Sequence, residues 1–272
     1  MPADRPQSDD RRLVLGAAVG MSVEHVRIFV ESLRLSGYTG PVVMLIGPTD
    51  FKLAAYLRTH GVEPRRVWFV RRLHGPIHAY RFELFARYLQ QDGERYDEVL
   101  ISDVRDVVFQ AHPFGGMMSK DCHFFLEGAG KTIGNEPTNI LYMRLFLAPA
   151  EVEAIAAHRI SCCGVLLGGT RAIAAYLERM TARLRAVPLP VRRKIGADTA
   201  FHNLIAHVTH EVPAVIVENN VLVATMGIEP ASRYLVGADG RIRTRDGHLP
   251  AILHQYDRID EIRAPVEARF AQ

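Results

Sequence analysis

Cysteine is scarce in this chain of 272 residues, which holds only Cys122, Cys162 and Cys163 and no Cys-x-x-Cys spacing. On an extended chain the neighbours Cys162 and Cys163 point to opposite faces, which makes them poor partners for a disulfide. An odd number of cysteines without a metal-type spacing argues against a disulfide framework. It favours a reduced, intracellular setting, and we expect a cytoplasmic protein.

Long apolar runs are also missing, because no stretch approaches the roughly 18 residues of a membrane span. The polar first 12 residues lack an apolar core of the kind that signal peptides carry, so we expect neither a signal peptide nor a transmembrane segment. The composition still allows a loose association with a membrane surface.

Lysine is rare as well, so the positive charge is nearly all arginine; the four lysines are Lys52, Lys120, Lys131 and Lys194. Arginine binds phosphates with two hydrogen bonds, although genomic composition explains such a bias equally well. The net charge of +3 is too small to indicate a nucleic-acid-binding protein. Two motifs are absent. The chain has no Gly-x-Ser-x-Gly elbow, which argues against a serine hydrolase, and Gly16 to Gly20 lacks the Gly-x-Gly-x-x-Gly spacing of a dinucleotide site.

Apolar strand-like runs alternate with helical patterns through the first hundred residues. Short turns join them, which predicts a mostly parallel, Rossmann-like sheet in an α/β protein. Ser22 is the expected N-cap of the first helix and Gly37 its C-terminal glycine. The expected strands are Leu13–Ala18, Val42–Ile46, Val67–Val70 and Val99–Ile101, and the expected helices are 22–36, 50–60 and 79–91.

The second half is less regular, with short strands around one clear amphipathic helix over 170–185. We expect one α/β domain over 12–258, a disordered lead-in over 1–11 and a tail over 259–272. The remaining expected strands are 123–126, 164–169, 212–217, 221–225 and 252–254, and the remaining helices are 139–146 and 198–206.

Two carboxylates interrupt a buried-looking stretch that runs from Asp97 to Phe109. Asp103 and Asp106 would face opposite ways on a straight strand, and they converge only if the chain turns there. A turn at the end of a parallel strand would place both in the ligand-binding crevice of the sheet, where they suit a hard divalent cation. Alternatively, either carboxylate pairs with Arg105 or caps a turn.

Three further positions are candidates. His254 follows a short apolar strand and could be the third ligand beside two carboxylates, or else a buried hydrogen-bonded histidine. Asp198 opens a helix and is either an N-cap or a carboxylate presented to sugar hydroxyls. Gly164 follows the two cysteines; small residues there let a ligand approach the backbone, whereas a reduced cysteine is most often core filler.

The combination resembles the GT-A-fold glycosyltransferases, which transfer a sugar from a nucleoside-diphosphate donor with the help of a divalent cation. The strongest part is 96–114, where Tyr-Asp-x-Val-Leu-Ile-Ser-Asp-Val-Arg-Asp-Val-Val-Phe precedes Pro-Phe and looks like that family's run into its DxD metal motif. The rest of the likeness, over 12–258, lies in the order and spacing of motifs. Two positions depart from the pattern: the spacing is Asp-x-x-Asp, and Thr199 follows Asp198 where such enzymes often carry glutamine.

The resemblance implies a UDP-linked nucleotide-sugar donor, a carbohydrate or glycan-type acceptor, and Mn²⁺ or Mg²⁺ as the cofactor. In the metal site it implies Asp106 as the chief ligand and His254 completing the shell, with Asp103 holding the metal or the donor ribose. Around the donor it implies Ala17 and Ala18 bordering the base, Arg81 contacting the donor, and Gly164 close to the ligand. Asp198 and Glu127 are the candidate catalytic groups. Two rival functions are a sugar-nucleotide pyrophosphorylase, whose basic loop after the first strand is missing, and a non-catalytic nucleotide-sugar-binding protein.

Overall fold

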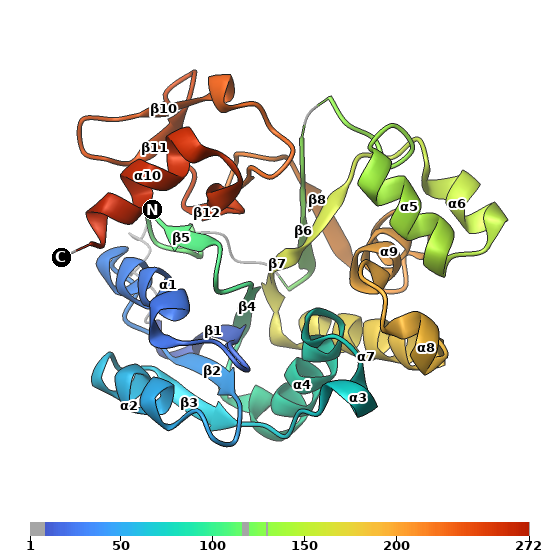
Figure 1. Ribbon diagram of the computed structural model, residues 1–272, viewed down its shortest axis with the longest axis horizontal. Helices are drawn as coiled ribbons and strands as arrows, with labels where there is room; N and C mark the ends of the chain where they lie inside the picture. The colour runs from blue at the N-terminus through green and yellow to red at the C-terminus, as the bar shows by residue number, and fades with distance from the viewer. Residues whose placement is uncertain (1–8, 116–119, 129, 272) are drawn as a thin grey trace, which may run out of the picture.

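A central sheet of seven strands, in the order β3-β2-β1-β4-β7-β6-β8, organises the computed structural model, which describes residues 9–115, 120–128 and 130–271 (Figure 1). Strands β1 to β4 are parallel, β7 is antiparallel to both of its neighbours, and β8 is parallel to β6. This confirms a mostly parallel α/β sheet. The strands are β1 Arg12–Ala17, β2 Val42–Ile46, β3 Glu63–Arg66, β4 Glu98–Ser102, β6 Cys122–Leu126, β7 Ser161–Gly169 and β8 Ala214–Val217.

Helices cover both faces of this sheet, because successive strand residues point to opposite sides. Leu13, for example, packs with α4, α7 and α9, whereas Val14 packs with α1 and α2. The α1 boundaries match the prediction, since Ser22 is its N-cap and Gly37 has the positive φ of 87° expected after a helix. The helices are α1 Val23–Leu35, α2 Phe51–Thr59, α3 Arg71–His74, α4 Ile77–Asp92, α5 Pro137–Phe146, α6 Pro149–Ile155, α7 Thr170–Ala186, α8 Leu189–Arg192, α9 Ala197–Leu204 and α10 Asp260–Arg269.

A second, three-stranded sheet in the order β5-β12-β9 lies beyond the end of β4 (Figure 1). Its middle strand β12 (Ile252–His254) pairs antiparallel with β5 (Val107–Phe109) and parallel with β9 (Val223–Thr225). The stretch that begins with β4 therefore leaves the main sheet and enters another one. A hairpin of β10 (Tyr234–Val236) and β11 (Ile242–Thr244) turns at the Asp239-Gly240 pair.

The predicted tail over 259–272 is wrong for most of its length. Residues 260–269 form α10, which buries Ile262 and Val266 in an apolar cluster with the second sheet. Phe270, directly after the helix, is also buried there. The folded part therefore continues well past His254.

The third strand was also predicted wrongly, because β3 is Glu63–Arg66 and not the apolar run Val67–Val70. Strand β3 lies at the edge of the sheet, where charged residues and Pro64 are tolerated because one side needs no partner. The more apolar run after it connects β3 to α3, and Trp68 is 70% exposed.

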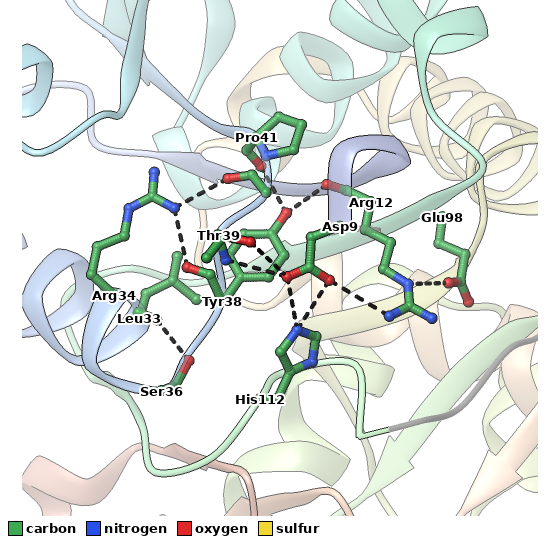
Figure 2. Close-up of polar contacts among 11 residues, drawn as sticks. Asp9, Arg12, Leu33, Arg34, Ser36, Tyr38, Thr39, Pro41, Glu98 and His112 are labelled. Carbon is green, nitrogen blue, oxygen red and sulfur yellow. Dashed lines mark hydrogen bonds and ion pairs between the residues drawn. The ribbon is translucent and has the colours of Figure 1, made fainter. Parts of the chain in front are cut away.

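The start of the described chain is held by a polar network (Figure 2). Asp9 accepts hydrogen bonds from Thr39, contacts the His112 imidazole at 3.1 Å and lies 3.6 Å from Arg12, which in turn pairs with Glu98 at 2.8 Å. Burial alone would raise the pKa of Asp9, but these hydrogen bonds outweigh it and lower that pKa. The predicted disorder over 1–11 does not extend to the 3-10 turn 9–11, and residues 1–8 lie outside the described ranges.

No helix in the described ranges combines the length and the apolar character that crossing a bilayer requires.

Candidate metal centre

The turn after β4 brings Asp103 and Asp106 together. Asp103 donates its backbone N–H to the carbonyl of Gly164 at 2.6 Å, which ties the strand end to β7. Val104 then turns into the core, where a Cβ on Gly16 would lie 2.8 Å from it. Val104 is buried and the chain turns over 104–106 before β5 starts at 107, so both carboxylates reach the same side. The prediction that the two aspartates need a turn to converge is confirmed.

His254 completes a group of three candidate ligands. It is paired in register with Val107 of β5, which directly follows Asp106. Its Nε2 atom lies 3.5 Å from Oδ2 of Asp103 and 4.0 Å from Oδ1 of Asp106. One ligand atom from each residue lies within 4.8 Å of the other two. Two carboxylates and one imidazole converge as the sequence predicted, from positions about 150 residues apart.

Within the described part of the chain, Nε2 of His254 has no hydrogen-bond partner, although the side chain is only 1% exposed. Buried polar atoms without partners are uncommon, because each loses its hydration without compensation. This nitrogen faces two carboxylates, so a cation bound between the three residues would satisfy all of them. The donor set fits a divalent metal such as Mn²⁺, which accepts both oxygen and imidazole ligands.

A bulge in β7 shapes the wall beside His254. The pairing of β6 with β7 jumps from Leu166 to Cys162, so the residues between them bulge out of that ladder. Gly164 lies in the bulge, and a Cβ at this position would be 2.7 Å from Oδ2 of Asp103 and 2.5 Å from Cε1 of His254. Only glycine leaves the site its present geometry, because Gly164 lies directly against two of the candidate metal ligands.

Cys162 supports the opposite side of the His254 ring. Its Sγ atom lies 3.3 Å from Nδ1 of His254 and also accepts a hydrogen bond from the backbone N–H of Gly164 at 3.3 Å. Burial alone would lower the pKa of His254, but the interactions with Cys162, Asp106 and Glu127 outweigh it and raise that pKa to about 9. The sequence indicated Cys162 only as core filler, so this contact was missed.

Glu127, a predicted catalytic residue, is buried at the end of β6. Burial raises the pKa of its carboxyl group, while His254 and a hydrogen bond with Cys162 act in the opposite direction. Glu127 therefore lies next to Cys162 and close enough to His254 to interact with its charge. Asp198, the other predicted catalytic residue, has different neighbours, Arg81 and Cys163.

Arg81 on α4 lies between two predicted site residues. Its guanidinium donates a hydrogen bond to Asp103 and is 3.8 Å from Oδ2 of Asp198. Asp198, in the first turn of α9, is also 3.8 Å from the thiol of Cys163. Asp103 is thus shared between Arg81 on one side and His254 on the other.

All three cysteines are free, as expected.

The two alanines at the end of β1 differ in their exposure. Gly16 pairs in register with Ser102, so this strand end lies beside the start of the metal group. Ala17 is half-buried, but Ala18 has no exposed surface and belongs to the core beneath α1. The side chain of Ala18 therefore cannot border a ligand in this conformation.

Arg105 lies at the limit of ion-pair distance from Asp106, so the alternative interpretation, in which one of the aspartates pairs with Arg105, holds in part. Its guanidinium is half-exposed and lies 3.3 Å from Asp257, against 4.0 Å from Asp106. Asp257 was missed by the sequence analysis, although it follows His254 by only three residues.

The candidate centre is distinct from a large surface groove of about 560 Å³ beside β11, which includes Arg233, Thr244 and Arg245. None of the three candidate ligands lines that groove.

No protein-family model and no curated protein sequence matches the chain. Its function therefore has to be inferred from the arrangement of its own residues.

Proposed function

We propose that the protein is a divalent-cation-dependent glycosyltransferase that moves a sugar from a UDP-linked nucleoside-diphosphate donor to a carbohydrate-type acceptor. The observation that carries the proposal is the group of Asp103, Asp106 and His254 at the carboxyl end of β4. Ligands of parallel α/β sheets bind in the crevice at this end of the strands. The resemblance of residues 96–114 to a GT-A metal motif is the reason for choosing a UDP-linked donor.

In this proposal Asp103, Asp106 and His254 hold Mn²⁺ or Mg²⁺ through two carboxylates and Nε2. A cation held there supplies positive charge to the diphosphate that departs from the sugar. Gly164 has no side chain, so the imidazole of His254 and the carboxylate of Asp103 can lie directly against its backbone.

Arg81 is the second positive group in this proposal. Its guanidinium lies between Asp103 and Asp198, so a cation that attracts the Asp103 carboxylate would leave part of Arg81 free to bind phosphate oxygens of the donor. Asp198 then keeps Arg81 oriented from the other side, and its carboxylate is available to a sugar or acceptor hydroxyl. Glu127, buried beside Cys162, is the second proposed catalytic carboxyl group.

Calorimetric titration of UDP, with and without Mn²⁺, tests the site. We expect Mn²⁺-dependent binding to the unaltered protein and its loss in Asp106→Ala. Asp260→Ala, which removes an exposed carboxylate on α10, is the matched control and should bind normally. UDP binding that needs no metal and is unchanged in Asp106→Ala would overturn the assignment.

The reaction itself is tested by incubating the protein and Mn²⁺ with a panel of UDP-sugars. Release of UDP, even slowly to water, supports the transferase. Formation of UTP from a UDP-sugar and pyrophosphate would instead identify a pyrophosphorylase, and binding without turnover of any donor would identify a nucleotide-sugar-binding protein.

A further inference from the structure

The connection from β3 to α4 presents large apolar side chains and arginines to solvent. Trp68, the single tryptophan of the chain, is 70% exposed, and Leu73 on α3 is 63% exposed. Phe51, at the start of α2, is 63% exposed, and the guanidinium of Arg66 lies 4.8 Å from the centre of its ring. We call the set Phe51, Arg66, Trp68, Arg71, Arg72 and Leu73 the Trp68 face. In Figure 1 its elements α2, β3 and α3 lie along the lower edge of the molecule.

The exposure of these side chains is not a consequence of loose packing beneath them. Phe69 packs against the core, and the rings of His74 and Tyr80 stack at 4.2 Å with an angle of 13° between them. The imidazole of His74 also accepts the backbone N–H of Val70 at 2.9 Å, which closes the turn of α3. Trp68 and Leu73 therefore project from a fixed support.

The arginines of this face have unbalanced charge. Among the described residues, no carboxylate lies within ion-pair distance of the guanidinium groups of Arg66, Arg71 and Arg72. Arg193 lies close by and donates a hydrogen bond to the backbone carbonyl of Arg72, which adds another positive group. Trp68, which lies between Arg66 and Arg71 in the sequence, thus has on both sides a guanidinium without a carboxylate partner among the described residues.

We propose that the Trp68 face docks the protein onto the surface of an acidic lipid membrane. Tryptophan is favoured at the boundary between headgroups and acyl chains, since its ring is apolar and its N–H is polar. Leu73 and Phe51 add apolar area that can enter this boundary, while the arginines contact lipid phosphates. Leucine cannot stack on a nucleobase, so the mixture favours a membrane over a single-stranded nucleic acid.

The location of the Trp68 face relates it to the candidate metal centre. Strand β3 ends at Arg66 and β4 ends at Ser102, and because these strands run parallel, both ends lie at the same edge of the sheet. Three strand spacings separate them, which is about 14 Å. Docking through this face would therefore hold the metal centre close to the membrane surface. The docking proposal does not depend on sugar transfer.

The fluorescence of Trp68 provides a direct test, because no other tryptophan contributes. The full-length protein is titrated with vesicles of phosphatidylcholine alone and with vesicles of equal parts phosphatidylcholine and phosphatidylglycerol. We expect a blue shift of the emission and sedimentation of the protein with the acidic vesicles only. Absence of both effects on acidic vesicles would overturn the proposal. So would a fluorescence change with an unstructured oligonucleotide that exceeds the change with vesicles.

Two sets of variants distinguish this face from general positive charge. Each arginine near an anionic surface contributes about a fivefold gain in binding, so Arg66→Gln/Arg71→Gln/Arg72→Gln should lose roughly 100-fold. The matched control Arg144→Gln/Arg171→Gln/Arg179→Gln removes three exposed arginines from α5 and α7 and should bind as the unaltered protein does. Leu73→Ser should weaken sedimentation while keeping the Trp68 signal. Equal losses in both triple variants would contradict a specific docking face.

Discussion

Gly164 lies so close to His254 that a Cβ at position 164 would be 2.8 Å from Nε2 of the imidazole. The ring is buried between this glycine and the two aspartates, so it has little room to move. The absence of a side chain at position 164 is therefore what allows the imidazole of His254 to occupy its present position.

We predict that Gly164→Ala weakens Mn²⁺ binding by at least about tenfold, because the new methyl group displaces His254 or Asp103. Crowding of this kind costs about 1–3 kcal/mol of folding stability, so the variant should still fold. Titration calorimetry and thermal unfolding measure the two effects. Gly93→Ala, where a Cβ meets only ordinary contacts at 3.4 Å and beyond, is the control. Normal Mn²⁺ affinity in Gly164→Ala would show that His254 is not a ligand.

Cys162 should determine which nitrogen of His254 faces the metal. A ligand that binds through Nε2 carries its proton on Nδ1, and that proton is donated to Sγ of Cys162 at 3.3 Å. We predict about tenfold weaker Mn²⁺ binding in Cys162→Ala and substantial recovery in Cys162→Ser, whose hydroxyl can accept the same hydrogen bond. Equal losses in both variants would indicate that Cys162 acts through packing alone.

The affinity for Mn²⁺ should depend on pH through His254. Its raised pKa, about 9, means that the metal-free protein carries a protonated imidazole at neutral pH, and the metal must displace that proton. Apparent affinity should therefore rise by up to about tenfold per pH unit below pH 9 and level off above it. Calorimetry in buffers of different ionisation enthalpy measures the released proton. In His254→Gln this proton release should disappear, and an unchanged release would assign it to another group.

Removal of Arg81 should lower the stability of the metal-free protein but enlarge the stabilisation that Mn²⁺ provides. Arg81→Ala leaves Asp103 and Asp198 without their shared positive partner, which we expect to cost about 1–3 kcal/mol of the free energy of unfolding. A cation bound at Asp103 replaces part of the lost charge. The increase in Tm on adding Mn²⁺ should thus be larger in this variant than in the unaltered protein. Arg87→Ala, which removes an exposed arginine of the same helix, should leave that increase unchanged.

Much of the fold could be predicted from local patterns. The limits of α1 follow from Ser22 and Gly37, because capping and positive φ are properties of single residues. The edge strand β3 was misplaced, since its charged sequence is allowed only by its position at the rim of the sheet. The reversed direction of β7 also depends on partners that are distant in sequence.

The candidate site was predictable in its ligands but not in its supports. Asp103 and Asp106 stand out because they interrupt apolar residues, and His254 because it ends a short apolar strand. The pairing of β12 with β5, which brings them together, leaves no local signature. The contact of Cys162 with His254 likewise joins residues 92 positions apart, and that of Arg81 with Asp103 joins residues 22 positions apart.

Strand β12 supplies the last of the proposed ligands very late in the chain, and its pairing with β5 spans more than 140 residues. During synthesis, the turn with both aspartates therefore exists long before the imidazole that joins them leaves the ribosome. Closing so long a loop is slow and is not favoured by local structure. Metal capture would consequently be one of the final events of maturation, reserved for chains whose carboxyl-terminal sheet has already assembled.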